Sequence, residues 1–355
     1  MVERVVERVA VAAVAVRTGF GRGGAGLLGA GFAGTPAFAP VTRFDTAGRR
    51  TDRAATLPGC PDLAEELTGV VAEVCAGLTA AQRAATPVLL AAHADAANAE
   101  VAAAVVAGTG VAGVPRTYTN ACVAASTAVA DAATVLRTGR AERVVVAAGY
   151  LVEPAMFGLF DAGRALARDG RARPFSRGRQ GMVLGDGVAA VLLTPNTSSP
   201  LATIEGWGRT GDGHHVVKPA PDGGGLARAI GTALERGGVD PAEVGYVNAN
   251  GTGTEFNDAA EVAALRRVFA RAPVPVSSTK SVHGHALEAS GLVELVVTVL
   301  ALGEGRLPVN AGYLGPDPAC ELDLVLEPRV AAPRYALTLN SAFGGANTAL
   351  LVGAP

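Results

Sequence analysis

The sequence predicts an α/β fold in which strands and helices alternate and pack in layers. Apolar runs of strand length, such as 188–193 and 244–248, are separated by longer segments with helical spacing, such as 123–138. Strands that alternate with helices are typical of α/β layer architectures. The chain of 355 residues is long enough for two domains or one large duplicated domain. A cluster of Asn, Thr, Ser and Pro at 195–200 predicts a boundary between 1–197 and 198–355.

The elements are assigned from their periodicity and from the glycines that follow several of them. Strands are expected at 9–16, 144–148, 188–193, 244–248, 274–277, 337–339 and 349–352. Helices are expected at 63–76, 88–106, 123–138, 226–236, 258–270 and 286–302. The stretch 35–57 is rich in Pro, Thr and Arg without clear periodicity, which indicates a loop.

Composition narrows the class of protein. Hydrophobic residues make up 49% and charged residues 17%, which predicts that part of the surface is covered by a partner subunit. A formal net charge of −2 gives no reason to expect a nucleic acid or an anionic membrane as partner. Apolar runs stay below the roughly 18 residues of a membrane span. Four cysteines without C-x-x-C spacing and an N-terminus without a signal-peptide pattern predict a reduced, cytoplasmic protein.

The candidate catalytic residues lie in three separated segments: 120–126 (NACVAAS), 248–254 (NANGTGT) and 280–285 (KSVHGH). Cys122 opens an apolar helix, where unpaired N–H groups and the helix dipole favour a thiolate and can hold a developing oxyanion. For the thiol alone, the alternative is a small buried hydrophobic residue. The three segments together favour acyl chemistry on sulfur.

His285 precedes the helix expected at 286–302, where a neutral imidazole can donate a hydrogen bond to a thioester carbonyl or relay a proton. Lys280 is a candidate to orient that ring, and the alternative is an ordinary solvated lysine. Glu294 interrupts an apolar helix, so as a buried carboxylate it needs a partner such as Lys280 or a backbone amide. In the glycine-rich segment, Thr252 and Thr254 are placed to bond an amide-rich arm such as pantetheine, or to form a simple polar turn.

These segments resemble β-ketoacyl-acyl-carrier-protein synthases, the ketosynthases of fatty acid and polyketide assembly. The resemblance covers most of the chain after Cys122. It rests on Pro174-Phe175, 181–187 (GMVLGDG), 251–261 (GTGTEFNDAAE), 278–281 (STKS), 284–285 (GH), 316–320 (PDPAC) and 340–347 (NSAFGGAN).

The resemblance implies a thiolase fold, with two similar halves in a five-layer αβαβα architecture, usually as a homodimer. It implies that Cys122 receives an acyl group from an acyl carrier protein or coenzyme A thioester, so that phosphopantetheine belongs to the substrate and no metal or redox cofactor is required. The N–H groups of Cys122 and Phe343 would form the oxyanion hole. Thr252 and Thr254 would contact pantetheine, and His285 the extender thioester.

Three departures from that family affect the expected chemistry. Asn250 stands where a second histidine is usual, and a carboxamide donates a hydrogen bond but does not exchange a proton at neutral pH. Glu288 replaces a usual glycine, which puts a carboxylate near the site as a partner of the His285 imidazole or on the surface. The region before Cys122 is shorter than usual.

Two further patterns are weak. Residues 21–26 (GRGGAG) satisfy G-x-G-x-x-G after a strand, but glycines are abundant here and no clear helix follows directly. His283, His285, Glu288 and the pair His214-His215 lack a recognisable metal-ligand spacing.

The leading hypothesis is therefore a condensing enzyme in polyketide or fatty-acid-like metabolism that forms an acyl–Cys122 thioester. One alternative is an acyltransferase that passes the acyl group to an amine, hydroxyl or thiol without decarboxylation. Another is a non-catalytic chain-length partner in a ketosynthase heterodimer.

Overall fold

A single mixed sheet of 12 strands organises the protein, whose computed structural model describes residues 8–95, 97–195, 197–270 and 272–355. The first eight strands are β1 (Val9–Thr18), β2 (Gly21–Arg22), β3 (Ala39–Pro40), β4 (Arg53–Ala54), β5 (Pro87–Ala92), β6 (Gly113–Tyr118), β7 (Val144–Tyr150) and β8 (Gly187–Thr194). The others are β9 (Ala202–Gly211), β10 (Val244–Asn248), β11 (Pro275–Ser277), β12 (Arg306–Leu307), β13 (Asp323–Leu324), β14 (Arg329–Val330), β15 (Tyr335–Ser341) and β16 (Ala346–Gly353).

The helices include those that cover the sheet and those that hold site residues. They are α1 (Leu63–Val74), α2 (Ala80–Ala84), α3 (Asn98–Thr109), α4 (Ala124–Arg137), α5 (Pro154–Ala162), α6 (Gly224–Gly237), α7 (Glu255–Val268), α8 (Lys280–His283) and α9 (Ser290–Glu304). Short helical turns are η1 (Leu27–Gly31), η2 (Ala121–Val123), η3 (Pro241–Glu243), η4 (Leu287–Ala289) and η5 (Pro318–Cys320). No helix in these ranges is both long and apolar enough to cross a membrane.

The strand order repeats in two successive parts of the chain. The first part runs β6-β5-β7-β8-β1 and the second runs β11-β10-β15-β16-β9, with β13 added beside β11. In each part the first three strands are parallel and the last two join antiparallel. An antiparallel pairing of β1 with β9 connects the two parts. The domain limits 1–197 and 198–355 stay a prediction, although the same topology is built twice.

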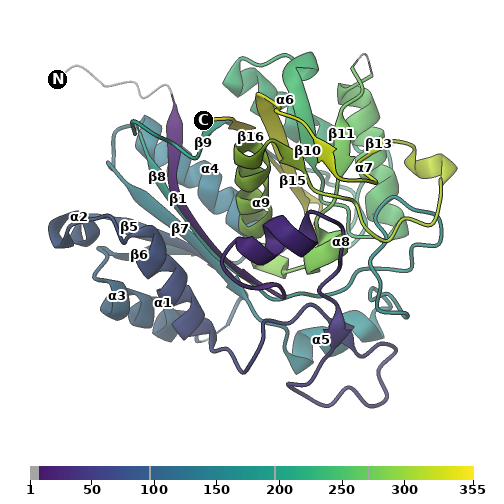
Figure 1. Cartoon of the computed structure of the whole chain (residues 1–355), viewed down its shortest axis with the longest axis horizontal. Helices are drawn as coiled ribbons and strands as arrows, with labels where there is room; N and C mark the ends of the chain where they lie inside the picture. The colour runs from purple at the N-terminus through teal and green to yellow at the C-terminus, as the bar shows by residue number, and fades with distance from the viewer. Residues whose placement is uncertain (1–7, 96, 196, 271) are drawn as a thin grey trace.

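The elements pack in five layers, as expected for a thiolase fold, and three large apolar clusters fill the spaces between these layers. The central cluster holds α4 and α9 between the inner faces of the two parts of the sheet. A second cluster lies under α6 and α7, and a third under α1 and α3. Figure 1 shows α9 in the middle of the molecule, with α1 and α3 on one outer side and α6 and α7 on the other. The two central helices begin near the segments that contain Cys122 and His285.

The helix expected at 88–106 is wrong. Residues Pro87–Ala92 form β5, which pairs in parallel with β6 and β7, and the helix α3 starts only at Asn98. An apolar run that is buried on both faces of a sheet shows no alternation, so alone it resembles a buried helix segment. Strands β6 and β9 and helix α5 were also absent from the expected elements.

The helix expected at 286–302 is interrupted at its start. Residues Leu287–Ala289 form a separate helical turn, in which Leu287 has a φ of 42°, and α9 begins at Ser290. This break matters because it positions Glu288 toward the nucleophile segment rather than along α9.

Candidate active site

Cys122 lies in the helical turn η2, directly before α4, where the two halves of the protein meet. The preceding Ala121 has a φ of 52°, a left-handed conformation that costs about 1–2 kcal/mol for a residue other than glycine. The turn η2 packs against η4, α9, β15 and β16. The thiol is therefore held by its own strained turn against elements of the C-terminal half.

The expectation that the helix start favours a thiolate is wrong for the resting protein. Burial raises the pKa of the Cys122 thiol to about 12, and the carboxylate of Glu288 raises it further, whereas Lys280 lowers it. Desolvation and a like charge disfavour the anion more than the nearby cation and backbone amides favour it. Cys122 is therefore protonated near neutral pH, and its thiolate must form as its proton leaves during attack.

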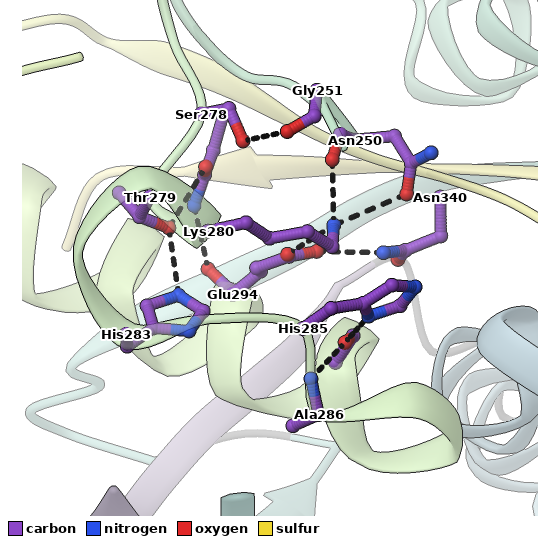
Figure 2. A network of polar contacts seen from close by, with 12 residues as sticks. Asn250, Gly251, Ser278, Thr279, Lys280, His283, His285, Ala286, Glu294 and Asn340 are labelled. Carbon is purple, nitrogen blue, oxygen red and sulfur yellow. Dashed lines mark hydrogen bonds and ion pairs between the residues drawn. The ribbon is translucent and has the colours of Figure 1, made fainter. Parts of the chain in front are cut away.

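Lys280 and Glu294 form a buried ion pair beside Asn250. The Lys280 side chain is 2% exposed and that of Glu294 is 0% exposed. The Lys280 ammonium also donates to the backbone oxygen of Asn250 at 2.8 Å and to its Oδ1 at 3.1 Å. Figure 2 shows Lys280 reaching from α8 to Glu294 and Asn250. The partner expected for Glu294 is confirmed, but the expected orientation of His285 by Lys280 is wrong, because the ammonium is directed to Asn250.

The same network continues to the helix of the nucleophile. Asn340 donates from Nδ2 to Glu294 Oε2 at 2.6 Å and accepts at Oδ1 from the Ser126 hydroxyl at 2.6 Å. Gly291 allows this close approach, because a Cβ there would lie 2.1 Å from Ser126 Oγ and 2.8 Å from Asn340 Oδ1. A chain of buried polar contacts thus runs from Asn250 to a residue one turn after Cys122.

The imidazole of His285 is held by Ser290 at the start of α9. The distance from Nδ1 to Ser290 Oγ is 2.7 Å, and this oxygen also accepts the Ala286 N–H at 3.0 Å. Oγ accepts from Ala286 and has one hydrogen of its own that can donate to Nδ1; in that tautomer the hydrogen of the neutral ring is on Nε2. Burial and Lys280 hold the pKa of His285 well below its usual 6.5. His285 is therefore a neutral donor rather than an imidazolium.

The carboxamide of Asn250 is oriented at both ends. Its Oδ1 accepts from Lys280, and its Nδ2 donates to Asn257 Oδ1 at 2.8 Å. Asn257 in turn donates to Asp258 Oδ1 at 3.2 Å. Since an amide nitrogen has two hydrogens, one N–H of Asn250 remains for a substrate oxygen.

The glycine-rich loop after Asn250 is fixed by buried contacts. Gly251 has a φ of 26°, and a Cβ there would lie 2.4 Å from Ser278 Cβ. Glu261 accepts from the N–H groups of Asn250 at 2.7 Å and Gly251 at 2.8 Å. The hydroxyls of Thr252 and Thr254 bond to each other at 2.9 Å. These contacts fix the backbone of the loop and hold the two threonine hydroxyls next to each other.

Phe343 lies on the turn between β15 and β16 and is 52% exposed. Its ring packs against the ring of Phe160, near the end of α5, and the two ring centroids are 6.1 Å apart. The ring is therefore on a turn that directly follows β15, the strand that packs against η2 and its Cys122.

Glu288 adopts neither of the two positions expected for it. Its side chain is buried, and Oε1 lies 2.9 Å from Nδ1 of His93, which follows β5, rather than against His285. The negative charge of Glu288 adds to the effect of burial in raising the pKa of the Cys122 thiol. Burial raises the pKa of Tyr150, and Glu288 is among the carboxylates that raise it further. Neither His93 nor Tyr150 had a signal in the sequence.

Ser126 and Asn340 are two further residues that sequence reasoning missed. Both stood inside segments that were recognised, 120–126 and 340–347, yet neither had an assigned role. In the described ranges, no group of three or more His, Cys, Asp or Glu side chains is arranged to hold a metal ion.

Comparison with known protein families matches this architecture. A model described as "Beta-ketoacyl synthase, N-terminal domain" matches residues 53–198, and one described as "Beta-ketoacyl synthase, C-terminal domain" matches residues 201–313. The fold is that of the thiolase-fold ketosynthases. The chain belongs to the β-ketoacyl synthase family.

Individual relatives narrow the comparison. Nodulation protein E of Rhizobium leguminosarum bv. trifolii is 38% identical over 245 residues, which are 65% of this chain and 59% of the relative. The 3-oxoacyl-acyl-carrier-protein synthase 2 of Synechocystis sp. is 35% identical over 246 residues, again 65% of this chain and 59% of the relative. The matched region thus spans less than two thirds of the length of these curated relatives.

Solved structures resemble the whole chain. The ishigamide ketosynthase/chain length factor has a TM-score of 0.90 at 25% identity and covers 98% of this chain and 99% of its own. A type II polyketide ketosynthase in complex with its acyl carrier protein and bound to the hexaketide has a TM-score of 0.88 at 22% identity, with 98% and 99% coverage. The second likeness shows the fold alone.

Proposed function

We propose that this protein is a ketosynthase-like enzyme that takes an acyl group onto Cys122 and condenses it with a second thioester. The observation that carries the proposal is the buried network from Asn250 through Lys280, Glu294 and Asn340 to Ser126, one turn after the nucleophile. This network connects the segments 120–126, 248–254 and 280–285 by buried polar contacts inside a β-ketoacyl synthase fold.

In the first step, Sγ of Cys122 attacks the carbonyl carbon of an acyl thioester. The sulfur–carbon bond of the donor breaks, the acyl group remains on Cys122, and the thiol proton leaves with the donor as its free thiol. The N–H groups of Cys122 and Phe343 are the proposed donors to the tetrahedral oxyanion. A raised thiol pKa makes this proton transfer part of the barrier.

In the second step, a malonyl-type thioester loses carbon dioxide and forms an enolate. The free N–H of Asn250 and the Nε2–H of His285 donate to the enolate oxygen. The enolate carbon then attacks the acyl–Cys122 carbonyl, a carbon–carbon bond forms, and the thiolate of Cys122 is released. Thr252 and Thr254 are proposed to bind the pantetheine arm of either substrate.

The proposed partners follow from this chemistry. The donor is an acyl carrier protein or coenzyme A, and phosphopantetheine enters as part of the substrate. A homodimer, or a heterodimer with a ketosynthase-like subunit, is proposed as the assembly. A ketosynthase/chain length factor and a ketosynthase–carrier complex stand among the structural neighbours. The cytoplasmic location stays a prediction.

A second candidate is acyl transfer without decarboxylation. The observation that favours it is Asn250, because a carboxamide fixed by Lys280 and Asn257 cannot take up or release a proton. An acyl carrier and a malonyl carrier supplied together distinguish the two: carbon dioxide and a β-keto product support condensation, whereas transfer of the acyl group without carbon dioxide supports the second candidate.

The test of acylation is the intact mass of the protein after mixing with a panel of acyl thioesters. We expect an added acyl mass on the native chain and none on Cys122→Ala. No acyl mass on the native chain with any donor would remove both candidates and favour a non-catalytic chain-length partner.

A further inference from the structure

A cluster of polar residues beside Cys122 is not used by the reaction steps above. His93 follows β5, and Tyr150 is the last residue of β7. These strands are parallel and pair Ala92 with Gly149, so the next residue of each, His93 and Tyr150, lies at the same carboxyl edge of the sheet. Ligand sites in α/β proteins commonly form at this edge.

Glu288 closes the cluster from the C-terminal half. The turn η4 that contains it packs against η2, β5 and β7. Its Oε1 bonds His93 Nδ1 at 2.9 Å, and Asn98 Nδ2 donates to the backbone oxygen of His93 at 2.7 Å. The Glu288 carboxylate is thus anchored on one oxygen by a residue that is itself held in place.

Two buried polar atoms of this cluster have no hydrogen-bond partner within the described residues. They are Oε2 of Glu288 and the hydroxyl of Tyr150, in residues that are 5% and 3% exposed. The turn η4 packs against both η2 and β7, so Glu288, Cys122 and Tyr150 lie on neighbouring elements. Burial raises the pKa of the Tyr150 hydroxyl well above its usual value, and nearby carboxylates, Glu288 among them, raise it further. Tyr150 therefore keeps its proton and is a hydrogen-bond donor, while Glu288 supplies an acceptor.

A hydrocarbon chain against such atoms leaves them unpaired, which costs about 1–3 kcal/mol for each buried group. A hydroxyl pairs with both, because it donates to a carboxylate and accepts from a phenol. Sites built to bond a hydroxyl discriminate strongly against the analogue without it. Because η2, which contains Cys122, packs against η4, which contains Glu288, an acyl group on Cys122 starts next to the element that contributes Glu288 to this cluster.

Resting on the proposed acylation of Cys122, we propose that Tyr150 and Glu288 form a polar subsite that selects acyl groups with a hydroxyl close to the thioester carbonyl. His93 is a positioning residue that leaves Oε2 of Glu288 available to the substrate.

The experiment compares two thioesters that differ by one hydroxyl, butyryl-pantetheine and β-hydroxybutyryl-pantetheine. The rate of acylation is followed by intact mass for the native chain, Tyr150→Phe and Glu288→Gln. Glu66→Gln, which removes a buried carboxylate from α1 in an outer layer, is the matched control. Thermal melts verify that each variant is folded.

We expect the native chain and Glu66→Gln to prefer the hydroxylated thioester in kcat/KM by about tenfold or more. Tyr150→Phe and Glu288→Gln should each bring the ratio toward unity. Equal rates in the native chain, a preference for butyryl, or a ratio that neither variant changes would overturn the subsite while leaving the proposed function intact. Absence of acylation by both thioesters would overturn the proposed function and the subsite with it.

Discussion

The hydroxyl of Ser126 donates to Oδ1 of Asn340 at 2.6 Å, across a sequence separation of 214 residues. This bond joins the helix that follows Cys122 to the strand before Phe343, and through Glu294 to the buried Lys280. The position of the nucleophile relative to the Asn250 loop is therefore coupled to hydrogen bonds that are inaccessible to water.

Removal of the Ser126 hydroxyl should destabilise the protein. Ser126→Ala leaves a buried acceptor on Asn340 unpaired, so the free energy of unfolding should fall by about 1–3 kcal/mol, measured by urea denaturation. Thr134→Ala on the same helix is the control, because its hydroxyl bonds only the helix oxygen of Ala130 in the contacts described. Equal effects of both substitutions would show that the Ser126–Asn340 bond has no special role.

The ion pair of Lys280 and Glu294 should behave as a unit. Lys280→Met leaves a buried carboxylate without its cation and should lower the free energy of unfolding by about 3–5 kcal/mol. The double variant Lys280→Met with Glu294→Gln should recover much of that loss, because Gln keeps an oxygen for Asn340 without an unpaired charge. Thermal melts of both variants test this, and a double variant no more stable than Lys280→Met would contradict it.

The thiol of Cys122 should react slowly with an alkylating reagent and respond steeply to pH. Since its pKa is raised to about 12, the thiolate is a minor species near neutral pH. The alkylation rate should then rise about tenfold for each unit of pH up to the pKa, because the thiolate is the nucleophile.

Glu288→Gln tests the cause of that raised pKa. Removal of the carboxylate charge lowers the thiol pKa, so alkylation at a fixed neutral pH should become faster than in the native chain. Cys122→Ala identifies the background from Cys60, Cys75 and Cys320. A plateau of the native rate near neutral pH, or slower alkylation of Glu288→Gln, would contradict the proposed electrostatics.

Replacement of Asn250 by histidine should raise the rate of malonyl decarboxylation by about tenfold or more, because an imidazole can exchange a proton where a carboxamide cannot. Burial and the neighbouring Lys280 charge would keep the new ring neutral, as they do for His285. Release of carbon dioxide from a malonyl thioester is the measurement. Asn250→Gln is the control, and an unchanged rate in Asn250→His would show that the carboxamide of Asn250 does not limit decarboxylation.

The sequence by itself determined the layered α/β fold, the strands β10, β11, β15 and β16 of the second half, and the segments around Cys122 and His285 that resemble the family. These features depend on local periodicity and on residue types at fixed spacing. Even the partner of Glu294 followed from the rule that a buried carboxylate needs a cation or a donor.

Tertiary structure alone decided the rest. It placed Pro87–Ala92 in the sheet, joined Ser126 to Asn340, directed Lys280 to Asn250, and set Glu288 against His93 and near Cys122. It also reversed the expected pKa shift of the thiol. The physical reason is that desolvation and long-range charge depend on which distant segments surround a group, whereas a sequence shows only the group and its neighbours along the chain.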